Sequence, residues 1–163
     1  MMQNFTTCMQ TLLRQFGLPA APTIGRRLSI EIDNKLLLHF GHDADLLTMF
    51  SSVGPLPAPE QSLRAQLLQQ TLEINCLADW PGIQIGTNDT EVELWSREWL
   101  DKIDESQFMH WVERFVTVAE HWQGILRGEL IAETPKGKPA FDHLNRYMPA
   151  RQARLLTPPP REK

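Results

Sequence analysis

The chain has 163 residues, of which 42% are apolar and 22% are charged, proportions that are ordinary for a globular protein. Its length is sufficient for one hydrophobic core, and its 2 cysteines exclude a disulfide framework. No apolar run approaches the ~20 residues that cross a bilayer, and residues 1–6 lack the basic and apolar regions of a signal peptide. We therefore expect a cytoplasmic protein of one domain, with or without a tail, and no membrane insertion.

Charge is divided unevenly along the chain. Residues 1–132 carry 9 Lys and Arg against 17 Asp and Glu, a net charge of −8, whereas residues 133–163 carry 7 against 3, a net charge of +4. An acidic body argues against nucleic acid as the main partner, because phosphate neutralisation requires a face of Lys and Arg. The last segment alternates prolines with basic residues, a composition typical of disorder. The sequence predicts a folded domain over residues 1–130 and a basic, proline-rich, largely disordered C-terminal tail over residues 131–163.

Hydrophobic periodicity predicts a helix and then a meander in the N-terminal part. Apolar side chains recur at helical spacing over residues 2–16, and Gly17 ends the helix. The period then changes to two, which indicates strands over residues 27–33, 36–40 and 46–53 that are separated by short polar turns. These three strands are expected to form an antiparallel meander.

The C-terminal part repeats this pattern with longer helices. The predicted elements are a helix over residues 61–75, strands over residues 83–85 and 90–95, and a helix that ends at Gly128. Asp104 and Gln107 form a capping box at the start of the last helix. Trp111 and Trp122 lie on its apolar face, where we expect them in the core. The predicted fold class is α+β: helix, three-strand meander, helix, two strands, helix.

Chemistry-bearing residues do not form a recognisable catalytic or metal site. His39, His42, Asp43 and Asp45 lie around one predicted turn, where polar residues are expected for turn formation alone. A zinc site would require three or four converging ligands that are oriented by further hydrogen bonds. Cys8 lies near the apolar stripe of the first helix, without a base partner, which indicates a small buried residue. We predict no metal, no cofactor and no catalytic residue.

Several segments resemble one known family. Residues 94–100 (LWSREWL), then Asp104 and Phe108, then residues 113–122 (ERFVTVAEHW) resemble the C-terminal signature of class I type III secretion chaperones, the CesT/Tir-chaperone family. Residues 67–75 are similar to the family's second helix, including its terminal asparagine.

The resemblance spans about residues 2–127 and implies a function. Members are homodimeric, cytoplasmic bacterial proteins that bind the N-terminal chaperone-binding segments of secreted effector proteins. They keep these segments extended and help deliver them to the export apparatus and its ATPase, without enzymatic activity of their own. The resemblance therefore implies an effector-binding chaperone with effectors, a second copy of itself and the export ATPase as partners.

An extended client can add a strand at a sheet edge and place alternate side chains in apolar pockets. The candidate effector-binding residues are Phe5, Met9 and Leu12 on the first helix and Leu38, Phe40, Met49 and Phe50 on the strands. The resemblance places the dimer contact on the second helix and the strand after it, at Leu67, Leu68, Leu72, Ile83 and Ile85. Each of these residues also fits plain packing within the core.

Two features depart from the family pattern. Residues 76–82 replace a glycine-rich connection, and the tail over residues 131–163 continues beyond the last helix. Longer members include chaperones that serve several effectors, so a multi-effector role is a hypothesis. The alternative is a regulatory protein of the same fold that sequesters a transcription factor. A third class, an enzyme, would require a polar cluster that converges in a pocket.

Overall fold

The structure, a computed structural model, describes residues 4–21, 23–77, 82–128 and 152–156. The helices and strands are α1 (Phe5–Gln15), β1 (Arg27–Ile32), β2 (Leu36–Asp43), β3 (Leu46–Pro55), α2 (Ser62–Leu77), β4 (Ile83–Thr87), β5 (Glu91–Trp99), α3 (Glu105–Leu126) and β6 (Ala153–Leu156). The predicted α+β class and the predicted order of elements through α3 are confirmed. Strand β6 was not predicted. Most other residues of the expected tail lie outside the described part, so their disorder stays a prediction.

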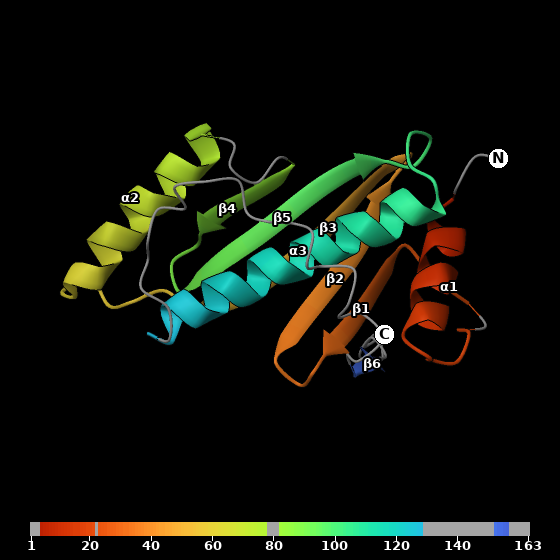
Figure 1. Ribbon diagram of the computed structural model, residues 1–163, viewed down its shortest axis with the longest axis horizontal. Helices are drawn as coiled ribbons and strands as arrows, with labels where there is room; N and C mark the ends of the chain where they lie inside the picture. Colours follow the sequence, from red (N-terminus) through yellow and green to blue (C-terminus); the bar gives the residue numbers. More distant parts are fainter. Residues whose placement is uncertain (1–3, 22, 78–81, 129–151, 157–163) are drawn as a thin grey trace, which may run out of the picture.

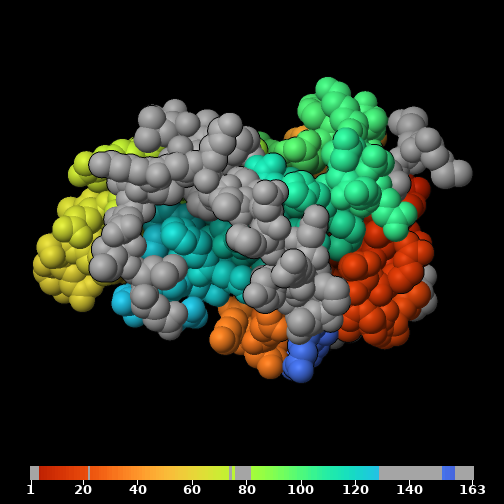
Figure 2. All heavy atoms as spheres, viewed as in Figure 1, coloured from red at the N-terminus to blue at the C-terminus, as the bar shows by residue number. Residues whose placement is uncertain are grey.

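The six described strands form one antiparallel sheet in the order β4-β5-β3-β2-β1-β6. Helix α3 crosses one face of this sheet, and α1 lies beside α3 at one end (Figure 1). Helix α2 lies next to β4, and its atoms (yellow in Figure 2) occupy the end of the molecule opposite to α1 (red). The core therefore lies between the sheet and the α1–α3 layer, and α2 is attached at the margin.

Local sequence accounts for the first turns. Asp33 and Asn34 both have positive φ, 52° and 53°, and the amide of Lys35 donates to the carbonyl of Ile32 at 3.0 Å. Positive φ at two successive residues is typical of a type I′ turn, and Asn and Asp tolerate it well. The connection between the paired residues Ile32 and Leu36 has three residues, 33–35. Gly17, with φ of 65°, ends α1 in the left-handed conformation that glycine adopts without a steric penalty. The predicted turn and helix stop are thereby confirmed.

Helix α3 supplies the centre of the core. The amide of Gln107 donates to Asp104 Oδ1 at 2.8 Å, and the amide of Asp104 donates to Gln107 Oε1 at 2.9 Å, which confirms the predicted capping box. Trp111 and Trp122 are buried, as predicted, and so is Phe115. The helix therefore starts at a residue that local hydrogen bonds define, and it buries one continuous apolar face against the sheet.

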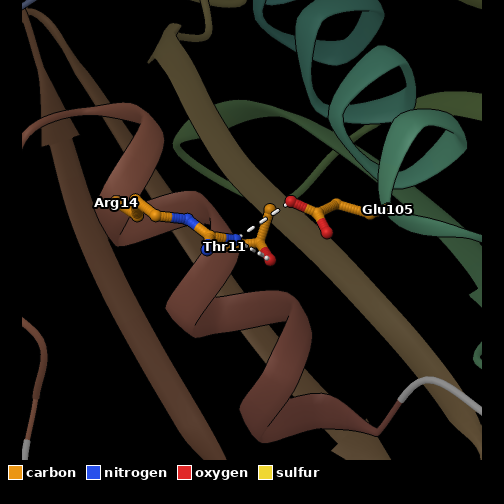
Figure 3. Close-up of polar contacts among 3 residues, drawn as sticks. All are labelled: Thr11, Arg14 and Glu105. Atoms are coloured by element: carbon orange, nitrogen blue, oxygen red, sulfur yellow. Dashed lines mark hydrogen bonds and ion pairs between the residues drawn. The ribbon is translucent and has the colours of Figure 1, made fainter.

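An exposed ion pair joins α1 to the first turn of α3. Arg14 Nη2 donates to Glu105 Oε1 at 3.0 Å and to Thr11 Oγ1 at 3.2 Å (Figure 3). The charged side chains are 72% and 57% exposed. Pairs of this kind contribute about 0–1 kcal/mol, so apolar packing rather than this contact holds the two helices together.

Two expectations from the sequence need correction. Strands β2, β3 and β5 extend beyond residues 40, 53 and 95, because β3 pairs with both β2 and β5 along much of its length. The second helix was expected to have one apolar face, but Leu67 is buried whereas Leu63 and Leu72 are exposed. Successive helical residues turn by about 100°, so Leu72 lies on a different side of α2 from Leu67. Leu63 lies one turn from Leu67 on the same side but is 38% exposed, so the apolar side is only partly covered.

Candidate functional site

Six of the seven predicted effector-binding residues lie in the core. The buried six are Phe5, Met9, Leu12, Leu38, Phe40 and Met49. Strand side chains alternate between faces, so Phe50 lies on the other face of the sheet, where it is half-buried. Direct contact between a client and the buried six would require the helices that cover the sheet to move. Their role in client binding stays a prediction, whereas Phe50 is accessible in this structure.

The sheet face opposite α3 carries a row of polar and aromatic side chains. Strand register places one residue from each strand in this row: Gln84, Trp95, Phe50, His39, Ser29 and Leu156. Ser29 Oγ lies 2.8 Å from His39 Nδ1, and the His39 and Phe50 ring centroids are 5.8 Å apart. The indole N–H of Trp95 donates to Gln84 Oε1. Side chains therefore contact one another in two parts of the row, from Ser29 to Phe50 and between Trp95 and Gln84.

Two observations define the character of this row. A Cβ atom on Gly86 would lie 2.7 Å from the Trp95 ring, so only glycine at this position leaves room for the indole to lie against β4. Burial lowers the pKa of His39, which keeps its imidazole neutral at pH 7. The half-buried aromatic side chains of the row, Trp95, Phe50 and His39, therefore form a largely uncharged aromatic band on the open face of the sheet. Of this row, the sequence marks only Phe50 as a client-binding candidate, because the row forms across strands and not along the chain.

The predicted dimer residues divide into a buried set and an accessible set. Leu67, Ile83 and Ile85 are buried within the chain. Leu68 is half-buried, and Leu72 is 67% exposed. Residues four apart lie on the same side of a helix, so Leu68 and Leu72 form an apolar stripe on α2 that the described part of the chain covers only in part, at Leu68. Whether it contacts a second copy stays a prediction.

The β4 edge of the sheet is closed by a side chain from α2. Asn75 Nδ2 donates to the carbonyl of Ile85 at 2.6 Å, and the amide of Ile85 donates to Asn75 Oδ1 at 3.1 Å. One asparagine thereby replaces a neighbouring strand at the middle of β4. Sequence reasoning noted Asn75 only as part of a resemblance, because a contact across ten residues between a helix and a strand has no local signature.

We expect Asn75→Ala to lower the free energy of unfolding by about 1–2 kcal/mol, because it leaves the amide and carbonyl of Ile85 without protein partners. The same change should speed hydrogen exchange of the Ile85 amide. Urea unfolding and exchange monitored by NMR test both effects. Gln69→Ala is the matched control, because Gln69 bonds only to Glu73 on the same exposed helix surface. If the Ile85 amide exchanges at the same rate in Asn75→Ala and in the wild type, Asn75 does not protect the edge of β4.

The opposite edge, at β1, is covered by β6. The two strands pair antiparallel from Ser29 opposite Leu156 to Ile32 opposite Ala153. Arg154 Nη2 lies 2.6 Å from Glu31 Oε2 across this ladder. Figure 2 shows the β6 atoms (blue) at the margin of the molecule, beside strand atoms drawn in orange. Both edges of the five-strand core sheet are therefore occupied, one by a side chain and one by a short strand.

His42 and Cys8, two of the residues considered for chemistry, have structural roles. His42 stacks on Phe5 at 4.5 Å between ring centroids, and its Nδ1 lies 3.2 Å from the Ala44 carbonyl. Cys8 is buried, as predicted, and burial raises the pKa of its thiol to about 11, so it carries little thiolate at neutral pH. Among the described residues, no group of three or more potential metal ligands converges. None of the described helices is long and apolar enough to cross a bilayer.

Comparison with known proteins matches the chain to one family and one fold. The model of the Tir chaperone protein (CesT) family matches residues 7–123. The structure is similar to the Yersinia pestis type III secretion chaperone SycH in complex with a stable fragment of YscM2, with a TM-score of 0.57 and 20% identity over 72% of this chain and 98% of that chain. No curated relative matches the chain.

Two further solved structures share the fold. The ExsC–ExsE complex matches with a TM-score of 0.58 and 15% identity over 72% of this chain and 90% of that chain. The HopA1–SchA chaperone–effector complex matches with a TM-score of 0.58 and 14% identity over 73% of this chain and 92% of that chain. At these identities the likeness establishes the architecture.

Proposed function

Because the chain belongs to the Tir chaperone protein (CesT) family, we propose that it is a type III secretion chaperone that binds N-terminal segments of secreted effector proteins. The observation that carries this proposal is the family match over residues 7–123, which covers almost all of the domain from α1 to α3. Similar folds occur in a chaperone–effector complex and in a secretion chaperone bound to a protein fragment. The family match favours this function over the regulatory alternative.

The proposal also covers the location, the oligomeric state and the partners of the protein. The protein works in the bacterial cytoplasm as a homodimer, catalyses no reaction, and delivers its clients to the export ATPase. The exposed stripe of Leu68 and Leu72 on α2 supports self-association, because an apolar surface of this kind is stabilised by contact with a second apolar surface. The acidic body of residues 1–132, with its net charge of −8, supports a protein partner over nucleic acid.

The proposed client surface consists of the aromatic band and the β1 edge. Phe50 and Trp95 offer half-buried rings on the open face of the sheet. The buried residues of the earlier candidate set lie in the core, on the other side of the sheet from this band: Phe5, Met9, Leu12, Leu38, Phe40 and Met49. An extended client would gain main-chain hydrogen bonds at the edge and apolar contacts beside it, which is the usual division of affinity and specificity in strand addition.

The experiment that tests the proposed function is capture of clients by the full, tagged chain from a bacterium that has an active type III secretion system. Mass spectrometry should identify secreted proteins, and fragments should show that their N-terminal segments suffice for binding. C-terminal fragments of the same proteins are the matched control. Recovery of a transcription regulator without any secreted protein would overturn the chaperone proposal.

A further inference from the structure

The two edges of the sheet differ in how firmly they are closed. At β4, Asn75 forms two hydrogen bonds with the backbone of Ile85, and the asparagine is part of α2, a helix that packs on the domain through buried Leu67. At β1, the covering strand β6 has only four residues, each of them half-buried or exposed. Segments with few buried contacts open locally at the lowest free energy. The β1 edge is therefore the one that opens more readily.

Main-chain pairing and one ion pair hold β6 in place. The amide of Asp33 donates to the carbonyl of Gln152 at 2.7 Å, and the amide of Gln152 donates to Asp33 Oδ1 at 2.8 Å. The side chain of Arg154, 68% exposed, pairs with that of Glu31, 23% exposed. A largely exposed pair of this kind contributes little to stability. It nevertheless favours a basic over an acidic side chain at the strand position opposite Glu31.

The contacts of β6 resemble those of an added peptide strand. Ala153 and Leu155 pack against the core from the margin of the sheet, whereas Arg154 between them faces Glu31 on the opposite face. Extended peptides that add to sheet edges bind in this way, with main-chain hydrogen bonds and alternating side-chain contacts. The edge of β1 therefore already accepts an extended segment with the pattern apolar, basic, apolar.

We propose that β6 is an internal placeholder on the β1 edge, which a client segment displaces when it adds to the sheet as a strand. This inference rests on the proposed chaperone function. It assigns the client chemistry at this site: an extended segment with apolar residues in place of Ala153 and Leu155 and a basic residue opposite Glu31. Between clients, β6 covers the main-chain donors and acceptors of β1, which would otherwise promote edge-to-edge association.

If a placeholder covers the edge, the apparent dissociation constant for a client equals the intrinsic dissociation constant divided by the fraction of molecules in which the edge is open. The probe for this effect is a fluorescein-labelled synthetic peptide with the sequence of residues 151–157, and its binding to the full chain is measured by fluorescence anisotropy. Arg154→Glu places two carboxylates opposite each other and should raise peptide affinity about tenfold. Leu155→Asp should do the same, because it removes the apolar contact of β6 with the core margin.

The control for both variants is Arg97→Glu. Arg97 is exposed on β5, and β3 and β2 separate it from β1. This variant changes the net charge by as much as Arg154→Glu and by more than Leu155→Asp, and it should bind the peptide like the wild type. Peptide affinity that is the same in Arg154→Glu, Leu155→Asp and the wild type would overturn the placeholder proposal. Higher affinity in these two variants but not in Arg97→Glu would support it.

A charge reversal tests the site itself and not only the loosening of β6. The wild type and Arg154→Glu should prefer the native peptide over a peptide with glutamate in place of arginine at the position of Arg154. Glu31→Lys should prefer the glutamate peptide, with the ratio of the two affinities shifted about tenfold in its favour. A general loss of structure cannot reverse this preference. The same preference in Glu31→Lys as in the wild type would overturn the assignment of the β1 edge.

Failure of this proposal can be told apart from failure of the chaperone function. If the wild type and Arg154→Glu capture the same secreted proteins equally well and these clients do not compete with the peptide, the placeholder proposal is overturned and the chaperone function stands. If the clients compete with the peptide and Arg154→Glu retains more of them, the proposal is supported. Recovery of no secreted protein by any variant overturns the chaperone function. In that case the peptide measurements still show whether an added strand displaces β6 from β1.

Discussion

Leu72→Asp is expected to raise the dissociation constant of the proposed homodimer at least about 100-fold, a change of about 3 kcal/mol. Leu72 is 67% exposed in the single chain and continues the apolar stripe that begins at Leu68. A carboxylate in a closed apolar contact must lose its hydration without gaining a partner, which costs several kcal/mol. Sedimentation equilibrium or light scattering over a range of protein concentrations measures the effect.

The matched control is Gln66→Asp. Gln66 is exposed on α2 but lies on a different side of the helix from Leu72, because the two positions are six residues apart. This variant should associate like the wild type and unfold at the same urea concentration. If Leu72→Asp forms a dimer with the same dissociation constant as the wild type, Leu72 and its side of α2 are not part of the dimer interface. A wild-type chain that stays monomeric at all accessible concentrations would contradict the homodimer itself.

Phe115→Ala is expected to lower the free energy of unfolding by about 3–5 kcal/mol, the usual cost of truncating a buried phenylalanine. Phe115 is 0% exposed at the centre of α3, the helix that covers the sheet. The loss is large for a protein of this size, since the total stability of a domain is only about 5–15 kcal/mol. Equilibrium urea unfolding, followed by circular dichroism, measures it.

The control for this prediction is Phe115→Leu, which keeps most of the buried volume and should lose less of the free energy of unfolding than Phe115→Ala does. The difference between their free energies of unfolding measures the cost of the cavity that alanine leaves, apart from the cost of losing the aromatic ring. Equal stability of Phe115→Ala and the wild type would contradict the placement of α3 at the centre of the core.

Elements with strong local signals were predicted well. The capping box of Asp104 and Gln107 defines the start of α3, and the asparagine and aspartate of the first hairpin select its turn. Both signals act between residues at most three positions apart, so the sequence displays them directly. Strand ends were predicted less well, because the length of β3 depends on its pairing with β5, which lies on a distant part of the chain.

The candidate site was predicted only in outline. Apolar periodicity marks Phe5 and Phe50 alike, yet one is buried under the helices and the other lies on the open face of the sheet. An apolar residue is equally suited to a core and to an interface, so composition and spacing cannot distinguish them. The closure of both sheet edges, by Asn75 and by β6, had no local signal at all.

Local patterns along the chain predict the α+β class, the order of the elements through α3 and the burial of the α3 tryptophans, and they carry the resemblance to secretion chaperones. These features depend on periodicity and on contacts between near neighbours, which are visible along the chain. Tertiary contacts set which leucines of α2 remain exposed, which side chains form the aromatic band, and the pairing of β6 with β1. Those features arise from contacts between residues far apart in sequence, and such contacts exist only once the strands have found their partners and register.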